Sequence, residues 1–341
     1  MRAASLVSIL AVAFNMNLSF GQLSWKINLE AGSYSTSNSI LKEKSDFSLR
    51  SEGDVKYNYE TQSSKSFLQL KVRPEIFGIS NKLYALKLKA SGGFVQTYEN
   101  YDWGVNFSAQ NHSYSGESIS ANFTSYFLQT NISYPISNTS VLLPNAGYAY
   151  QNIDFNGRRS IDIIFMDLKL ESSFNQYFRF GYGLYGEKFT LLNEQYLFNR
   201  SNENTNSGFR IGPQISVNYI RSLIISGEVR FLIHESKVTR YPSYEQLFRF
   251  VGGKILTEDL TLMLLIDFYT RNFTEKFSNR SESNLLYTPI NLENRFYLKL
   301  SYDFDDSLEL FSKVGYSKEY LYDRDLSLSG WNVSVGISLN N

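Results

Sequence analysis

The stretch GWNVSVGISLNN, residues 330–341, alternates apolar with small or polar residues up to its last two positions. Its apolar positions are Trp331, Val333, Val335, Ile337 and Leu339. Successive side chains of a β-strand point to opposite faces, so this pattern predicts a strand with one apolar face. A terminal edge strand invites unwanted pairing, whereas a strand that closes a ring has a partner on each side. The stretch therefore raises the expectation that the chain closes into a barrel.

The same period of two recurs along most of the chain. Clear examples are LSWKINLEA at 23–31, FLQLKVRPEIF at 67–77, YALKLKA at 84–90, LTLMLLIDFYTR at 260–271 and RFYLKLSYDF at 295–304. No segment shows a sustained apolar period of 3.6 residues, which an amphipathic helix requires. We therefore expect an all-β protein with almost no helix.

The connections between these runs fall into two classes that alternate along the chain. Short turn-forming connections are expected at 79–82, 135–140, 172–176, 219–222, 256–259 and 304–307. Longer polar connections are expected at 36–65, 99–117, 191–206, 237–246 and 274–292, with shorter ones near 154–159 and 322–328. This alternation predicts turns at one edge of the sheet and loops at the other.

Six short turns imply six hairpins, and the opening and closing strands bring the expected count to about 14, within a range of about 12–16. The two longest early loops contain the alternating stretches DVKYNYE at 54–60 and WGVNF at 103–107. These either extend strands beyond the main sheet or raise the count to sixteen.

Alternation by itself fits both a soluble β-sandwich and a transmembrane barrel. In a sandwich the apolar face packs on a second sheet, whereas in a barrel it meets lipid and the polar face lines the lumen. Strands near ten residues or longer, the alternation of turns with loops, and the final strand all favour the barrel. We therefore predict a transmembrane up-and-down antiparallel β-barrel, formed by residues 22–341 as a single domain.

Composition excludes several classes of protein. The chain has 33 basic and 33 acidic residues, so it lacks the basic surplus typical of a nucleic-acid binder. It has no cysteine, which excludes disulfides, thiol catalysis, zinc sites built on cysteine and lipid attachment at an N-terminal cysteine. Aromatic residues make up 16% of the chain, which is rich for a soluble enzyme.

The N-terminal residues have the pattern of a secretory signal peptide. Arg2 supplies a positive charge, and LVSILAVAF at 6–14 supplies an apolar segment of the usual length. Ser19 and Gly21 are small residues that suit cleavage before Gln22. A retained membrane helix would need about 20 apolar residues. We predict that residues 1–21 are a cleaved signal peptide.

On these features the sequence resembles the bacterial outer-membrane β-barrels, porin-like and of the Bacteroidota type by its FGQ at 20–22, without matching a particular subfamily. The resemblance implies an outer-membrane location, contact with membrane lipid, periplasmic turns and extracellular loops. It also implies that the barrel-assembly machinery recognises the last strand through Trp331, Val333, Val335, Ile337 and Leu339. The terminal aromatic residue common in that family is replaced by Asn341.

Candidates for catalysis or metal binding are few. His112 lies beside Ser113 in NHSYSG and resembles part of the outer-membrane phospholipase motif, but we expect it in a polar loop without an oriented partner. His234, followed by Glu235, is expected near the end of a strand. Carboxylates at Asp303, Asp305 and Asp306 fit turn chemistry better than a calcium loop. We therefore predict no enzyme activity, no metal and no cofactor.

The polar phase of the strands is the most informative set. We expect the lumen to be lined by Lys71, Arg73, Lys169, Arg179, Arg210, Arg230, Arg271, Lys299, Glu171, Glu187, Glu228 and Asp267. The same phase also carries Lys26, Lys87, Lys89, Arg249, Lys313, Glu30, Glu75, Asp167, Asp303 and Glu309. Charges of both signs are interleaved, so they can form a ladder of ion pairs. They can equally line a polar channel that weakly favours anions.

The main functional hypothesis is an outer-membrane channel for small hydrophilic solutes. The alternative is a non-enzymatic barrel component of an export or surface-assembly system, whose partner is a polysaccharide or a secreted protein. A third hypothesis, a barrel enzyme that hydrolyses lipids or peptides, rests only on the two histidines.

Overall fold

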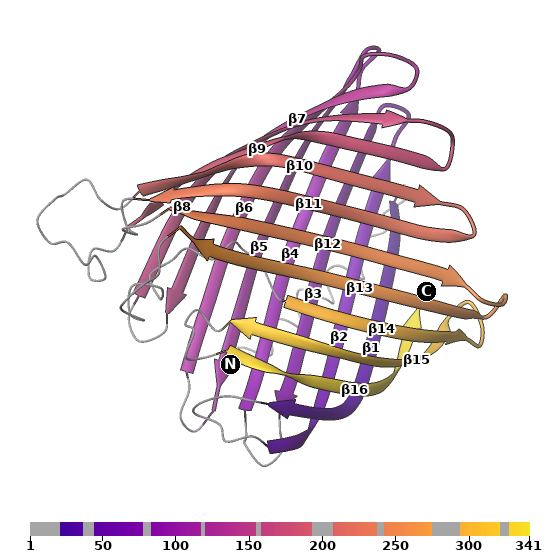
Figure 1. The fold of residues 1–341 in the computed structure, drawn as a ribbon. Coiled ribbons are helices and arrows are strands. Elements are labelled where there is room, and N and C mark those ends of the chain that lie inside the picture. Colours follow the sequence, from indigo (N-terminus) through magenta and orange to yellow (C-terminus); the bar gives the residue numbers. More distant parts are fainter. Residues whose placement is uncertain are drawn as a thin grey trace, which may run out of the picture.

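Sixteen strands close into one barrel in the computed structural model (Figure 1), which describes residues 21–36, 44–77, 83–116, 120–154, 158–192, 207–236, 242–274, 294–320 and 327–341. The strands are β1 (Gly21–Thr36), β2 (Lys44–Glu60), β3 (Ser64–Phe77), β4 (Leu83–Thr97), β5 (Asp102–Ser115), β6 (Ser120–Pro135), β7 (Ser140–Asp154), β8 (Arg158–Ser173), β9 (Phe178–Leu191), β10 (Ser207–Ile220), β11 (Leu223–Ser236), β12 (Ser243–Ile255), β13 (Leu260–Phe273), β14 (Asn294–Asp303), β15 (Leu308–Tyr320) and β16 (Ser327–Asn340). Each strand pairs antiparallel with its neighbours in the chain, and β1 also pairs with β16.

The all-β prediction is confirmed, while the preferred count of about fourteen strands is wrong. The two extra strands, β2 and β5, contain the alternating stretches at 54–60 and 103–107 that lay inside expected loops. On the inner face β2 carries mostly Ser, Asn, Asp and Glu, and β5 carries Asp102, Asn106, Ser108, Gln110 and His112, so their low overall hydropathy obscured the alternation. The predicted signal peptide lies outside the described residues, apart from Gly21, which begins β1.

Every short connection among the described residues lies at one end of the barrel, here called the turn end. These connections span 61–63, 98–101, 136–139, 174–177, 221–222, 256–259 and 304–307. The opposite end, the loop end, holds the other strand termini, including those of β1 and β2 at Thr36 and Lys44. The ends of β3 and β4 that flank 78–82 also lie there, so the expected turn at 79–82 was assigned to the wrong edge. Residues 79–82 lie outside the described part of the chain.

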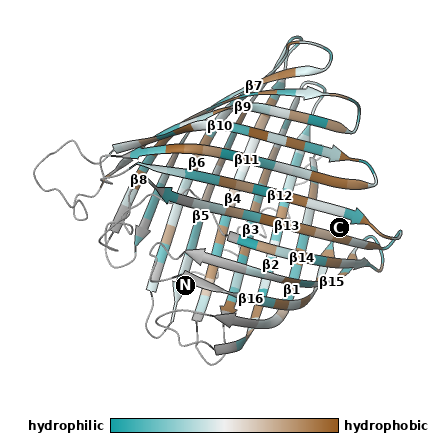
Figure 2. Cartoon of the chain, viewed as in Figure 1, coloured by the Kyte–Doolittle hydropathy of each residue, from teal (hydrophilic) through white to brown (hydrophobic). Residues whose placement is uncertain are grey.

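The two faces of the barrel wall differ in polarity, and Figure 2 shows hydrophobic and hydrophilic residues alternating along the strands. On β6, Leu128 faces outward and is 52% exposed, whereas its neighbour Gln129 faces the lumen and lines an internal cavity. The same alternation places Trp331, Val333 and Val335 of β16 on the exposed outer face. In the described ranges no helix is long and apolar enough to cross a membrane.

The seam between β1 and β16 runs from the pair Lys26–Asn340 to the pair Tyr34–Asn332. At its turn end, Asn341 accepts a hydrogen bond from the backbone N–H of Trp25 through Oδ1 at 2.8 Å. Within the seam, a Cβ atom on Gly32 would lie 2.2 Å from the carbonyl oxygen of Val333. Glycine therefore allows the close approach of the first and last strands at this point.

Three prolines interrupt the hydrogen-bonded ladder on one side only. Pro74, Pro144 and Pro213 lie inside β3, β7 and β10, and each falls in a gap of the pairing with one neighbouring strand. Pairing on the other side continues through each proline. Proline lacks a backbone N–H, so it cannot donate to a ladder that is otherwise continuous.

The turn at 304–307 confirms the preferred interpretation of the aspartate cluster. Oδ1 of Asp305 accepts hydrogen bonds from the N–H and hydroxyl of Ser307, both at 2.7 Å, and from the N–H of Leu308 at 2.8 Å. These bonds, first that from the Ser307 hydroxyl, hold the pKa of Asp305 below its ordinary value. Nowhere among the described residues do three or more His, Asp or Glu side chains gather as a metal site would require.

The assignment of faces predicts opposite outcomes for two adjacent substitutions on β6. Leu128→Arg places a charge on the apolar outer face, which we predict to contact lipid, and should cost about 2–4 kcal/mol of folding free energy. Gln129→Arg places the same charge in the lumen and should cost far less. Urea titrations of the barrel refolded into lipid vesicles measure both values. Equal losses for the two variants would contradict the assignment.

The two ends of the barrel should differ in accessibility on intact cells. Thr274 follows β13 at the loop end, and Asn138 lies in the turn between β6 and β7. A cysteine at Thr274 should react with a membrane-impermeant thiol reagent, and a cysteine at Asn138 should not. Labelling at Asn138 as fast as at Thr274 would show that the orientation is reversed or that the chain does not span the membrane.

Candidate functional site

The charged side chains of the inner wall form ion pairs, some within one strand and some between strands. Among the twelve residues expected to line the lumen, the structure gives ion-pair partners to Lys71, Arg73, Lys169, Arg179, Arg210, Arg230, Lys299, Glu171, Glu187, Glu228 and Asp267. The side chain of the twelfth, Arg271, lies outside the described part of the structure. Both alternatives from the sequence, a ladder of ion pairs and a charged lumen, are therefore compatible with the observed wall.

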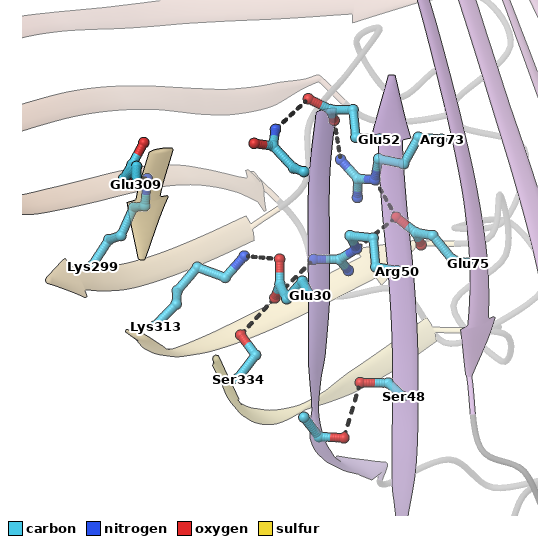
Figure 3. Close-up of polar contacts among 12 residues, drawn as sticks. Glu30, Ser48, Arg50, Glu52, Arg73, Glu75, Lys299, Glu309, Lys313 and Ser334 are labelled. Atoms are coloured by element: carbon cyan, nitrogen blue, oxygen red, sulfur yellow. Dashed lines mark hydrogen bonds and ion pairs between the residues drawn. The ribbon is translucent and has the colours of Figure 1, made fainter. Parts of the chain in front are cut away.

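One network, the seam network, surrounds Glu30 of β1 (Figure 3). Its carboxylate accepts hydrogen bonds from Lys313 at 2.7 Å, from Ser334 at 2.6 Å and from Arg50 at 3.5 Å. Arg50 also donates a hydrogen bond from Nε to Glu75 of β3 at 2.9 Å. Glu30 is buried, so its charge is compensated by cations and not by bulk water. The network thereby joins β15, β16, β1, β2 and β3 from inside the lumen.

Glu75 and a further carboxylate, Glu309, also bridge strands near the seam. Glu75 also forms ion pairs with Arg73 and, at 3.8 Å, with Lys87 of β4. Near the turn end, Glu309 pairs with Lys299 and, across β16, with Lys26 at 3.4 Å. Each of the two carboxylates therefore contacts basic groups from more than one strand. The arrangement links strands that are far apart in the sequence but adjacent in the closed barrel.

A second network, the Arg210 network, lies near the loop end on β9–β12. Arg210 has a fully buried side chain and contacts Glu187 at 3.0 Å and Glu245 at 3.0 Å. Glu245 is also 2.7 Å from Nδ1 of His234. The ring of Phe189 packs edge-on against His234, with centroids 5.3 Å apart. Arg210, His234 and Glu245 are each 1% exposed and Glu187 is 8% exposed, so the network is part of the packed wall and not of an ion path.

His112 does not occupy the surroundings expected from the sequence, whereas His234 lies near the end of β11 as expected. His112 was expected in a loop, but it lies within β5 and packs 5.7 Å from the ring of Phe123. Its neighbour Ser113 points to the opposite face, where it bonds Asn111 and Asn122. Alternation along a strand separates adjacent side chains, so His112 and Ser113 cannot act together as the resemblance to the phospholipase motif would require. In the same way, the carboxylate beside His234 belongs to Glu245 and not to the adjacent Glu235.

A cavity of about 400 Å³ lies inside the barrel, and strands from β4 to β13 line it. Its polar lining residues are Lys89, Ser108, Gln110, Ser125, Gln129, Asn145, Asp167, Tyr185, Glu187, Arg210, Glu228, Arg230, Arg249 and Asp267. Its apolar lining includes Phe127, Ala149, Ile163, Phe165, Leu232 and Leu247. A volume of this size is within the range of small-molecule sites.

An aromatic ridge crosses the wall of this cavity. The rings of Phe127 and Phe165 stack at 5.3 Å and those of Phe165 and Tyr185 at 6.5 Å. Gly147 of β7 makes the first contact possible, because a Cβ there would lie 2.4 Å from the Phe165 ring. The guanidinium of Arg230 lies over the Tyr185 ring at 4.4 Å. The inner wall is therefore partly apolar, contrary to the expectation of a uniformly polar lumen.

In most of the lumen ion pairs the basic side chain is more exposed than its acidic partner. The side chain of Arg249 is 62% exposed, whereas its partner Asp267 is 6% exposed. Arg179 is 61% exposed against 19% for Glu171. The reverse holds for Glu228, which is more exposed than Arg230, and slightly for Glu52 beside Arg73. The charged groups that meet the open lumen are therefore mainly cationic.

Sequence reasoning missed several residues of the site. Glu245 fell in the expected loop at 237–246, although it shares the inner face of β12 with Ser243 and Leu247. Arg295, which pairs with Asp267 at 2.6 Å, was also missed, because it lies at the start of β14 directly after the expected loop at 274–292. The apolar cluster of Ala149, Ile161, Ile163 and Phe189 was also missed. The run IDIIFM at 161–166, apolar in both phases at its centre, was the available signal.

Comparisons with known proteins give a fold and no family. No protein-family model matches the chain, and no curated protein matches its sequence. Among solved structures, CdiB from Acinetobacter baumannii matches with a TM-score of 0.51 and 8% identity, over 93% of this chain and 60% of CdiB. The chain has the fold of a bacterial outer-membrane barrel. It spans 60% of the length of CdiB, and the identity is too low to carry more than the fold.

Two further structures match at lower TM-scores. The toluene transporter TodX of Pseudomonas putida has a TM-score of 0.41 and 10% identity, over 97% of this chain and 91% of TodX. Pseudomonas putida OprB has a TM-score of 0.44 and 9% identity, over 94% of each chain.

The Arg210 network predicts a large difference between two arginine substitutions. Arg210→Gln leaves Glu187 and Glu245 buried without their shared cation and should lower the free energy of unfolding by about 3–5 kcal/mol. Arg249→Gln removes a mostly exposed guanidinium, and Arg295 still compensates Asp267, so the loss should be below about 1 kcal/mol. Urea unfolding of the two refolded barrels, followed by tryptophan fluorescence, compares them. Similar losses would mean that Arg210 is not an essential part of the packed wall.

Proposed function

We propose that this chain is an outer-membrane channel that passes small hydrophilic solutes and prefers anions. The supporting observation is the inner wall, where carboxylates lie close to the backbone and the longer basic side chains extend past them. Arg179 and Arg249, each more than half exposed, are the clearest cases. Fixed charges that line a narrow polar passage set its ion selectivity. Exposed cations raise the local concentration of anions even when the total charge of the wall is nearly balanced.

The proposal includes a location and two kinds of partner. The exposed apolar outer face, which includes Leu184 and Met166, suits contact with membrane lipid. The outward row of Trp331, Val333, Val335, Ile337 and Leu339 on β16 is the surface that we propose the barrel-assembly machinery recognises. Export to the outer membrane through a signal peptide at residues 1–21 completes this hypothesis. The polar solute itself passes along the inner wall.

Conductance in planar bilayers tests the proposal directly. The purified barrel should form pores whose reversal potential in a potassium chloride gradient has the sign of chloride preference. The double variant Arg179→Gln, Arg249→Gln should shift that potential toward potassium, because two exposed cations leave the lumen. Lys65→Gln at the turn end removes a positive charge beside Glu60, away from the cavity, and is the matched control.

Three results would count against the proposal. A barrel that is folded but gives no conductance would favour the alternative, a component of an export or surface-assembly system. Preference for potassium in the unmodified protein would contradict the argument from exposed cations. An unchanged potential in the double variant would show that these arginines do not line the conducting path.

A further inference from the structure

An unfavourable arrangement of charge lies on the inner face of β3 and β4. Lys71 is directly opposite Lys89, and Arg73 is directly opposite Lys87. Like charges in directly opposed positions destabilise a pair of strands. Two such pairs side by side concentrate positive charge on one part of the wall, which we call the basic block.

Carboxylates compensate three of the four cations in the basic block. Lys71 lies 2.7 Å from Asp54, and Arg73 and Lys87 both contact Glu75. Lys89 differs from them, because none of the described carboxylates lies within 4.0 Å of its ammonium group. Its side chain is exposed and lines the cavity inside the barrel. The basic block therefore presents one uncompensated cation to the lumen.

The wall next to Lys89 is neutral and rich in hydrogen-bonding groups. Gln110 of β5 is directly opposite Lys89, and Ser125 of β6 is directly opposite Gln110. The cavity lining contributed by β5, β6 and β7 contains Ser108, Gln110, Ser125, Phe127, Gln129, Asn145 and Ala149, none of them charged. Oδ1 of Asn145 is buried and makes no hydrogen bond within the described part of the chain. Neutral donors and acceptors suit hydroxyl groups of a ligand.

The charges on the far wall of the cavity are already compensated. Arg210, Arg230 and Arg249 each pair with a carboxylate at 3.0 Å or less. Asp167 has no such ion pair, but it accepts a hydrogen bond from Gln214 and lies in the field of Arg230. A ligand therefore gains most by placing a single negative group at Lys89. The ridge of Phe127 and Phe165 offers an apolar surface to the carbon skeleton of the same ligand.

We propose that this cavity is a binding site for a small hydroxylated carboxylate, a sugar acid in chemical class. Its carboxylate pairs with Lys89, its hydroxyl groups bond the amides and hydroxyls of β5–β7, and its C–H face contacts the aromatic ridge. The cavity volume of about 400 Å³ accommodates a molecule of this size. The proposal rests on the channel function and adds a class of solute to it. A solute that crosses a channel must bind, but weakly enough to leave.

Titration calorimetry on the refolded barrel tests the site without requiring an open pore. Sodium glucuronate is the probe, with glucose and sodium phosphate as controls at constant ionic strength. The unmodified barrel should bind glucuronate more tightly than either control. Lys89→Gln should weaken glucuronate binding about tenfold, the loss expected for one charge-assisted hydrogen bond, and leave any glucose binding unchanged. Lys89→Arg should retain most of the affinity, and Lys65→Gln should retain all of it.

Folding and function can be separated in this experiment. Lys89→Gln removes a like-charge pair, so the variant should unfold at the same or a higher urea concentration than the unmodified barrel. Equal binding of glucuronate by Lys89→Gln and the unmodified barrel would overturn the proposal. Phosphate binding as tight as glucuronate binding would overturn the assignment of the ligand class. Glucuronate binding without bilayer conductance would retain the site and reject the channel.

Discussion

The sixteen strands form a closed barrel because β1 pairs with β16. An open sheet in an apolar medium would leave two rows of unpaired N–H and C=O groups, and each unpaired group costs several kcal/mol. The seam between the first and last strands removes both rows. From inside the lumen, Glu30 adds side-chain contacts to Lys313, Ser334 and Arg50, which lie on the strands at either side of β1. Backbone pairing and side-chain charge thus stabilise the same junction.

The lengths of the charged side chains decide which sign of charge is exposed to the lumen. Asp and Glu are short, so a carboxylate that points inward stays near the wall, where neighbouring cations cover it. Lys and Arg are longer and carry their charge past that layer toward water. Asp267 and Arg249 show the difference within one ion pair. A wall with nearly balanced formal charge can therefore present a cationic surface, and the basic block on β3 and β4 strengthens this effect.

The sequence predicts the features of the fold that depend on neighbouring residues and misses those that depend on residues far apart in the chain. Alternation is local, so the barrel class, the outward row on β16 and the inward phase of residues such as Arg210 could be predicted. Partners are not local: the contacts of Arg210 to Glu187 and Glu245 depend on the register of four strands. The strand count failed where polar residues on the inner face of β2 and β5 made the segments look like loops.

Burial was the least predictable property. Charged residues on the inward phase were expected to face water, yet Arg210 is 1% exposed and Glu187 is 8% exposed. Inner-face packing between non-adjacent strands decides this, as in the contact of Phe127 on β6 with Phe165 on β8 over Gly147. A uniform rule of polar inside and apolar outside therefore describes the turn end of the lumen better than the middle and the loop end.

Closure of the barrel can be measured by a disulfide across the seam, and the chain offers a clean background because it contains no cysteine. Ala31 and Val335 are directly opposed in the observed register, whereas Val333 is opposed to Ser33. The variant Ala31→Cys, Val335→Cys should oxidise quickly and completely in the folded barrel, giving a species with altered migration on a denaturing gel. The matched variant Ala31→Cys, Val333→Cys should oxidise slowly. Equal rates for the two variants, or no disulfide in either, would contradict the closed barrel.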